Sequence, residues 1–427
     1  MLSLSDGRNG PFDAGASPGQ RQTGYTVGGV GWYRRTLVTP PLDRQSASLA
    51  LLLEGCYMNC TVYLNGHPIT HHPYGYTLFS VPLARAALAP PGEANTIAVR
   101  VGNTGSNSRW YSGSGLYRPV TLLAAPALHL VPSYQGGVYI TTPDVKLVGD
   151  GGTAVATARV HVAVRNDATR QSAPTRARLV ACDERARVVA SGWASVAGVA
   201  AGQLANLTAV DLPLGTVKTW SPDQPALLSL AACLEADCAS SLLSAKPGDT
   251  CPAAPPTAGS GSSGSDASTT TLVETFGVRA FTFSSATGLV LNGKSIKLQG
   301  GCVHHDVSLA CIRIGSPALP ACALCSHSKT CNAPSHPSPL STPPTYALPS
   351  RLLRAQNGPL GSKAIARADE RRVERLKANG YNAIRTSHNP PSRAFVRACD
   401  ALGVVLMVEA FDTWEVCAQL GMPTTHA

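Results

Sequence analysis

The segment at residues 381–391, Tyr-Asn-Ala-Ile-Arg-Thr-Ser-His-Asn-Pro-Pro, constrains the fold of this chain most. A short apolar strand, Ala383-Ile384, runs into a polar turn that carries Arg385, His388 and Asn389, and two prolines stiffen the exit. A (β/α)8 barrel builds its active-site rim from loops of this kind, each placed between a strand and a helix. The chain ends at residue 427, whereas a complete barrel needs roughly 250 residues. The sequence therefore predicts a barrel that is begun and not completed.

Composition and charge indicate a globular chain without a nucleic-acid partner. The chain is 44% hydrophobic and 14% charged, which is compatible with a packed core. Its net charge of +10 is concentrated, because residues 307–368 hold six Lys and Arg and no acidic residue. The rest shows no basic stripe with interleaved aromatics, so we expect no nucleic-acid partner.

No apolar run approaches the roughly 18 residues of a membrane span, and the first residues lack the basic and apolar pattern of a signal peptide. We therefore expect no membrane association. The compartment is left open, with the cytoplasm as the default.

The 13 cysteines are an odd number at irregular spacing, so at least one thiol is unpaired within a monomer. They do not settle the redox compartment. Cys322, Cys325, His327 and Cys331 have zinc-like spacing, but they lie in a Pro/Ser-rich stretch with no ordered element to orient ligands. We therefore expect no metal there.

Residues 1–125 are predicted to form a jelly-roll domain. Short strands are indicated at 31–38, 48–54, 96–101 and 116–123, and this spacing is typical of a sandwich or jelly roll. Between them, residues 60–69 form a hairpin, because Asn65-Gly66 supplies the positive φ angles of a tight turn.

Residues 126–284 are predicted to form a second β-sandwich. The stretch 156–164 alternates strictly between polar and apolar residues. Residues 253–270 hold Pro, Gly, Ser and Thr without a large apolar residue and cannot pack a core. We interpret them as part of a disordered insert near 235–270 within the domain, so that strands 227–232 and 270–279 pair across it.

Residues 285–427 change to an α/β pattern. Helices are predicted at 364–379 and 393–402 and strands at 383–385 and 404–408, and such alternation is typical of a parallel sheet. Residues 312–357 contain eight prolines and no acid, and are predicted to be a disordered insert. Their composition also suggests the hypothesis that they are translated non-coding sequence.

Several motifs together resemble glycoside hydrolase family 2, the group of β-galactosidases, β-glucuronidases and β-mannosidases, and they look closest to β-galactosidases. The matching stretches lie at 28–35, 62–67, 74–76, 108–118, 220–225, 276–279, 291–294, 302–306, 382–391 and 409–414. The resemblance implies a sugar-binding jelly roll, an immunoglobulin-like sandwich and the first third of a TIM barrel. It implies an exo-acting retaining β-glycosidase of carbohydrate metabolism that acts on a β-galactoside or related glycoside, with two catalytic carboxylates about 5–5.5 Å apart.

The chain differs from the family in its catalytic residues. In relatives the acid/base glutamate lies on the fourth barrel strand and the nucleophile lies later, so this C-terminally truncated chain has a counterpart of neither. The chain as given is predicted to be inactive, and a catalytically inactive carbohydrate-binding protein is the alternative. The resemblance implies no required cofactor, although the complete enzyme could hold a divalent cation such as Mg²⁺. An oligomer is compatible with the sequence.

The candidate substrate-binding residues on the first two strands are His304, Arg385, His388 and Asn389. Imidazole and amide groups can bond sugar hydroxyls without carrying the charge of the reaction. His304 begins a His-His-Asp run that could also be a metal site, but adjacent residues usually point apart, so we favour a substrate-facing His304. A turn that satisfies its own backbone is the alternative for His388.

The remaining candidates are Glu409, Asp412, Trp414 and Arg109. The resemblance makes Glu409 and Asp412 supporting carboxylates, not the catalytic pair, and places Glu409 where some relatives bind a cation. Trp414 either faces a sugar ring or is core. Arg109 lies in a jelly-roll loop that in relatives reaches over the barrel mouth to the sugar.

Overall fold

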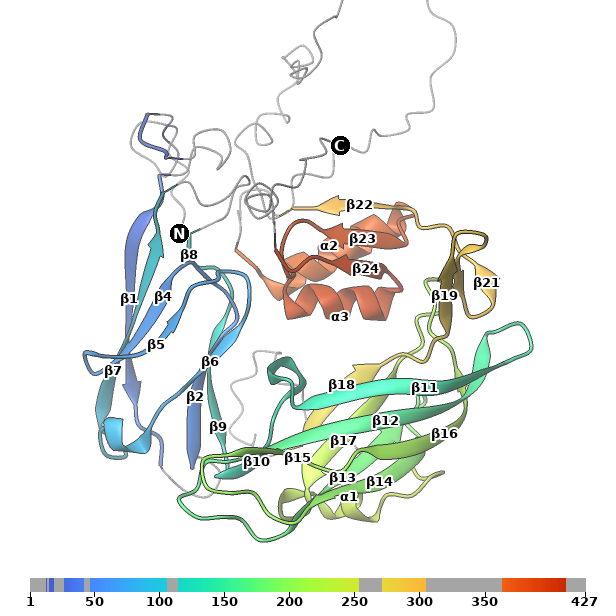
Figure 1. The fold of residues 1–427 in the computed structure, drawn as a ribbon, viewed down its shortest axis with the longest axis horizontal. Helices are drawn as coiled ribbons and strands as arrows, with labels where there is room; N and C mark the ends of the chain where they lie inside the picture. The colour runs from blue at the N-terminus through green and yellow to red at the C-terminus, as the bar shows by residue number, and fades with distance from the viewer. Residues whose placement is uncertain are drawn as a thin grey trace, which may run out of the picture.

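The computed structural model describes residues 13, 15–18, 27–41, 47–105, 114–252, 271–304 and 363–411. Two β-sandwiches are followed by a short α/β segment, which lies against both of them (Figure 1). We call these parts the first sandwich, the second sandwich and the α/β segment. The predicted insert at 312–357, including the zinc-like motif, lies outside the described residues.

The first sandwich packs two antiparallel sheets face to face. Its outer sheet has the order β1 (Gly29–Val38), β7 (Ala94–Asn103), β4 (Cys60–Leu64) and β5 (His67–His72), and its inner sheet has the order β6 (Phe79–Pro82), β2 (Ser48–Leu53) and β9 (Val120–Ala125). The strands β3 (Cys56–Tyr57) and β8 (Gly115–Leu116) pair beside them, and η2 (Arg85–Ala87) precedes β7. Leu53, Val62 and Val81 are fully buried between the sheets. Asn65 and Gly66 have φ angles of 50° and 87°, which confirms the predicted turn between β4 and β5.

The second sandwich also consists of two sheets. One contains β10 (Leu128–Leu130), β12 (Thr153–Asn166), β11 (Val138–Val148), β15 (Leu204–Asn206) and β16 (Val210–Lys218). The other has the order β14 (Val188–Val196), β13 (Thr175–Cys182), β17 (Leu228–Leu234) and β18 (Leu272–Phe276), and η3 (Ser133–Gln135) precedes β11. The alternation predicted at 156–164 places Ala158, Val160 and Val162 in the core. The strands β17 and β18 pair antiparallel, which confirms the predicted pairing across the insert.

The insert itself is smaller than predicted. Residues 253–270 lie outside the described residues, but residues 235–252 are ordered and form η4 (Glu235–Asp237) and α1 (Ser240–Ser244). The prediction of disorder from residue 235 was therefore wrong for this part. The reason is cross-linking, because disulfides join Cys182 to Cys251 and Cys233 to Cys238.

The α/β segment follows a small antiparallel sheet of β19 (Phe281–Ser284), β20 (Gly288–Leu291) and β21 (Lys294–Ser295). It contains a parallel sheet with the order β22 (Gly300–Val303), β23 (Ala383–Thr386) and β24 (Val405–Val408), with α2 (Ala366–Ala378) and α3 (Arg393–Leu402). Both predicted helices and the parallel arrangement are confirmed. None of the helices in the described part of the chain is long and apolar enough to cross a membrane.

Local sequence explains where α3 begins and ends. The Ser392 hydroxyl accepts a hydrogen bond from the backbone N–H of Phe395 at 3.1 Å and caps the N-terminus. Gly403 adopts the left-handed conformation, with φ of 71°, and its N–H donates to the carbonyl of Cys399. Phe395 and Cys399 are buried against Ile384 of β23 in the core of the α/β segment.

The α/β segment is fastened to the second sandwich by polar contacts. The indole N–H of Trp220 donates to the backbone carbonyl of Asp400 at 2.8 Å. The ammonium of Lys377 donates to the carbonyls of Pro222 and Gly403 at 2.8 and 3.0 Å. Since these contacts involve both helices, they fix the orientation of the parallel sheet and thus of its strand ends.

Candidate active site

The carboxyl ends of the three parallel strands gather the polar residues predicted from the sequence. His304 directly follows β22, Arg385 lies in β23, His388 and Asn389 follow it, and Glu409 directly follows β24. Neighbouring parallel strands end at the same edge, which is where a barrel carries its site. We call these five residues the rim cluster.

Glu409 is the centre of the rim cluster. Its carboxylate forms an ion pair with the Arg385 guanidinium and lies 2.8 Å from Nδ1 of His388. Its backbone N–H donates to the Thr386 hydroxyl at 3.3 Å. The carboxylate therefore contacts two side chains, one from the neighbouring strand and one from the turn that follows it, and its supporting role toward a sugar stays a prediction.

His304 and Asn389 complete the cluster from either side. The His304 ring meets the His388 ring edge to face, with centroids 5.2 Å apart and an interplanar angle of 74°. His304 and Asn389 are each only 8% exposed. The Asn389 side-chain oxygen is buried and has no hydrogen-bond partner among the residues that the structure describes. A buried polar atom of this kind is costly unless something bonds it, so it is suited to receive a hydroxyl.

Charge within the rim cluster is largely compensated. A hydrogen bond to the Cys302 sulfur, 3.3 Å away, raises the pKa of Arg385, and the nearby Glu409 carboxylate raises it further. The guanidinium therefore stays charged and paired with Glu409. An uncharged, hydroxyl-rich ligand fits such a site better than an anionic one, because the cation is already neutralised.

Three predicted site residues cannot be placed. Arg109, Asp412 and Trp414 lie outside the described residues, so their roles stay predictions. The expected cation at Glu409 also stays a prediction. Within the described ranges, His, Cys, Asp and Glu side chains form no group of three or more that could hold a metal ion.

Sequence reasoning missed the residues by which the first sandwich supports this rim. The Tyr74 hydroxyl donates to the carbonyl of Ala410 at 2.6 Å, next to Glu409. Arg118 donates to the carbonyl of Pro390 at 2.8 Å, next to Asn389. Both residues lie in stretches that carry the family resemblance, and this was the only signal that could have found them.

Burial explains how these supports work. The Tyr74 ring meets that of Tyr76, which in turn contacts Tyr57 and Tyr117. Burial raises the pKa of Tyr74 to about 12, so its hydroxyl remains a donor at ordinary pH. Arg118 is 4% exposed and also donates to the carbonyls of Glu54 and Tyr76, at 3.3 and 3.0 Å. The first sandwich thus holds a backbone carbonyl beside each of two rim residues.

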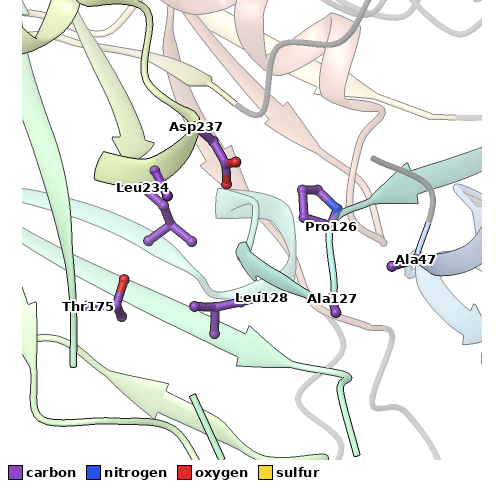
Figure 2. A pocket seen from close by; sticks show the side chains of 8 residues that line it. Ala47, Pro126, Ala127, Leu128, Thr175, Leu234 and Asp237 are labelled. Atoms are coloured by element: carbon purple, nitrogen blue, oxygen red, sulfur yellow. The ribbon is translucent and has the colours of Figure 1, made fainter. Parts of the chain in front are cut away.

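A separate cavity of about 190 Å³ lies where the two sandwiches meet, away from the rim cluster (Figure 2). Its lining is mostly small or apolar and includes Ala47, Pro126, Leu128 and Leu234, with Asp237 at one side. A sugar site needs several convergent hydrogen-bonding groups. This cavity lacks them among its lining residues, so the rim cluster is the better candidate.

Comparisons with known proteins agree with this geometry. Residues 363–424 match the TIM barrel domain of glycosyl hydrolases family 2. The chain is 29% identical over 398 residues to beta-galactosidase BoGH2A of Bacteroides ovatus, covering 92% of this chain and 35% of that protein. A family 2 glycosyl hydrolase structure from Bacteroides cellulosilyticus has 29% identity and a TM-score of 0.67, covering 96% of this chain and 40% of that one.

A Bacteroides uniformis beta-glucuronidase structure shares the fold, with 22% identity and a TM-score of 0.62, covering 90% of this chain and 36% of that one. The chain thus shares with family 2 glycosyl hydrolases a β-rich N-terminal part and, over residues 363–424, the start of the family's barrel domain. Over most of its length the chain is therefore similar to members of glycoside hydrolase family 2. It spans about 35–40% of the length of the relatives named first.

Proposed function

We propose that the rim cluster is the sugar-binding edge of an exo-acting retaining β-glycosidase, with a terminal β-galactoside as its ligand. The first sandwich corresponds in this proposal to a jelly roll, the second to an immunoglobulin-like sandwich, and the α/β segment to the first third of the barrel. The observation that carries the proposal is the set of hydrogen-bonding groups on His304, His388 and Asn389 at two adjoining strand ends.

Two observations support a galactoside over a glucuronide. The similar Bacteroides ovatus protein is a beta-galactosidase. The cation that a uronate carboxylate would seek, Arg385, is already paired with Glu409. A negatively charged sugar would have to compete with that carboxylate, whereas a neutral one leaves the pair intact.

We further propose that the 427-residue chain binds the sugar without cleaving it. Retaining hydrolysis needs a nucleophile and an acid/base about 5–5.5 Å apart. The carboxylate in the described part of the rim is Glu409, and it is held by Arg385 and His388. A carboxylate so engaged serves to position its partners, not to attack a sugar.

Saturation-transfer NMR on the full chain tests the binding proposal. Methyl β-galactoside should give a signal, and methyl β-glucuronide a much weaker one. Asn389→Ala should remove the galactoside signal, whereas Arg34→Ala, on the outer strand β1, should keep it. An equal or stronger glucuronide signal would overturn the substrate assignment, and a galactoside signal that survives Asn389→Ala would overturn the site.

A chromogenic β-galactoside tests the second proposal. We expect no turnover by the purified chain above the uncatalysed rate. Turnover at the roughly 1–1,000 s⁻¹ typical of enzymes would show that the described carboxylate, or one beyond the described residues, performs the chemistry.

A further inference from the structure

The cysteines of the described chain divide sharply by domain. All six in the two sandwiches are paired, as Cys56–Cys60, Cys182–Cys251 and Cys233–Cys238. The two in the α/β segment, Cys302 and Cys399, are thiols. Random placement of cysteines would not leave every one in the sandwiches opposite a partner, so the division needs an explanation.

Two of the disulfides serve one small core. Cys182 and Cys233 lie on the adjacent strands β13 and β17 and are buried with Val180, Val188 and Leu242. This satellite core lies beneath residues 235–252, which leave the sheet after β17. A five-residue helix and few apolar side chains give this excursion little burial of its own, and small cores of this kind are commonly stabilised by disulfides.

Backbone hydrogen bonds also position the excursion. The N–H of Cys251 donates to the carbonyl of Ala186 at 2.7 Å, and the N–H of Val188 donates to the carbonyl of Asp249 at 2.9 Å. This short ladder brings the Cα atoms of Cys182 and Cys251 to 6.1 Å. Those of Cys233 and Cys238 are 5.3 Å apart. Both separations lie within the range that disulfides require, roughly 4.4–6.8 Å.

The buried side chain of Arg178 also holds the excursion, residues 235–252, against the sheet. The guanidinium of Arg178 is 7% exposed and donates to the carbonyls of Leu242 and Ala245 at the end of α1. Burial lowers the pKa of Arg178. If the excursion opened, these contacts would be lost, so cross-links that hold it shut also protect them.

We propose that the second sandwich is completed by oxidation of Cys182 with Cys251 and of Cys233 with Cys238, and that the chain therefore matures in an oxidising compartment and not in the cytosol. Cytosolic thiols are kept reduced, whereas secretory compartments form and keep disulfides. This inference replaces the default expectation of a cytoplasmic protein. It does not depend on the proposed sugar site.

The oxidation step needs an electron acceptor, which we assign to the disulfide of a thiol-oxidising protein. A thiolate of the chain attacks that disulfide and forms a mixed disulfide, and the second thiolate of the chain then displaces the partner's sulfur. Each cross-link forms one S–S bond in the chain and breaks one in the partner. Two electrons and two protons pass to the partner, which leaves as a dithiol.

Thiol trapping followed by peptide mass spectrometry tests the proposal on the full chain. Cells that naturally make the protein are lysed in denaturant with N-ethylmaleimide, which blocks free thiols before they can oxidise. Trypsin is then applied without reductant. Because Lys246 precedes a proline, we expect peptide 179–185 joined to peptide 219–279, with Cys233 and Cys238 two hydrogens short and no maleimide on any of the four.

Cys302 and Cys399 provide the internal control, because both should carry maleimide. Maleimide on Cys182 and Cys251 in material from those cells would overturn the proposal. Cell fractionation gives a second readout, in which the chain should separate with extracytosolic markers. A chain found in the cytosol would overturn the proposed compartment even if the cross-links are present.

Thermal unfolding measures what the longer cross-link contributes. The double variant Cys182→Ser/Cys251→Ser should melt on the order of 10 °C lower than the wild type. Dithiothreitol should lower the wild-type midpoint more than that of the double variant. Cys302→Ser, which removes a thiol outside the second sandwich, should match the wild type. Equal midpoints for wild type and double variant would contradict the proposed role.

Discussion

Arg118 connects the interior of the first sandwich to the rim. Its guanidinium donates to three backbone carbonyls, at Glu54, Tyr76 and Pro390. Unsatisfied buried acceptors are expensive. Replacement of this one side chain should therefore affect both the stability of the chain and the geometry of the rim.

We predict that Arg118→Met lowers the free energy of unfolding by about 3 kcal/mol, because three partly buried carbonyls lose a donor. Urea unfolding measures the change, and the galactoside NMR signal should weaken in parallel. Arg34→Met removes an exposed guanidinium and should change stability by less than about 0.5 kcal/mol. Equal effects of the two variants would show that the Arg118 hydrogen bonds contribute nothing.

His72 should make the stability of the first sandwich depend on pH. Burial lowers its pKa below the ordinary 6.5, with the neighbouring His71 adding to the effect, and its ring stacks on Phe79 with centroids 4.2 Å apart. The unfolded chain therefore takes up a proton first as the pH falls below 6.5. Stability is full above that pH and is lost as the pH falls toward the folded-state value.

Melting curves between pH 7.5 and about pH 5 test this sign. His72→Gln removes the titrating group, so its midpoint should fall less steeply with pH than that of the wild type. His67→Gln, at the exposed end of the same hairpin, should leave the slope unchanged. A steeper slope in His72→Gln would contradict the assigned direction.

At the scale of secondary-structure elements, the two glycines that follow α2 and α3 form a matched pair of positions for mutation. Gly380 follows α2 with φ of 84°, and Gly403 follows α3 with φ of 71°. A Cβ at Gly380 would meet nothing within 4 Å, whereas one at Gly403 would collide with the backbone carbonyl of Pro222 in the second sandwich. The two positions share the conformational strain of an alanine and differ only in the contact.

Gly380→Ala should therefore cost about 1–2 kcal/mol, the price of a left-handed alanine. Gly403→Ala should cost about 3 kcal/mol or more, because the contact between α3 and the second sandwich must also open. Denaturant unfolding gives both values. If the two variants were equally stable, the packing of α3 against Pro222 would not matter in solution.

Features that depend on residues close together in the sequence could be predicted, whereas contacts between distant residues could not. Asn65-Gly66 and Gly403 act on their immediate neighbours, so the sequence alone predicted the turn and the end of α3. Arg118 and Pro390 meet across 272 positions, and no local pattern indicates that contact. The pairing of Cys182 with Cys251 was likewise hidden, because spacing alone does not define connectivity.

The site shows the same limit. The sequence places its residues at the ends of strands, and parallel strands end together, so their gathering at one edge could be predicted. The pairing of Glu409 with both Arg385 and His388 depends on the register of β23 against β24, in which Arg385 lies opposite Met407. Register between strands separated by a helix is not encoded in any one of them.

At the scale of the whole molecule, the parallel sheet carries an exposed apolar edge. Met407 and Val408 of β24 are 60% and 53% exposed, and Phe411 just beyond is also 60% exposed. In the described part of the chain, β24 pairs only with β23. An edge strand of this kind is a template for pairing with another chain.

We therefore predict that the purified 427-residue chain self-associates as its concentration rises. Met407→Lys should reduce the association, since a charge on an edge strand opposes pairing. Val155→Lys places the same charge on an exposed position of β12, which is paired on both sides, and should have no effect. Size-exclusion chromatography with light scattering distinguishes the cases, and a monomer at every concentration would contradict the prediction.

The two donors that reach across from the first sandwich, Tyr74 and Arg118, also limit how this chain can be re-engineered by exchanging modules. A chimera that grafts a foreign N-terminal sandwich onto this α/β segment would keep every rim side chain and still lose the anchors of the loops that carry Asn389 and Glu409. Transplants should succeed only when the donor sandwich brings a tyrosine and an arginine to the same two carbonyls.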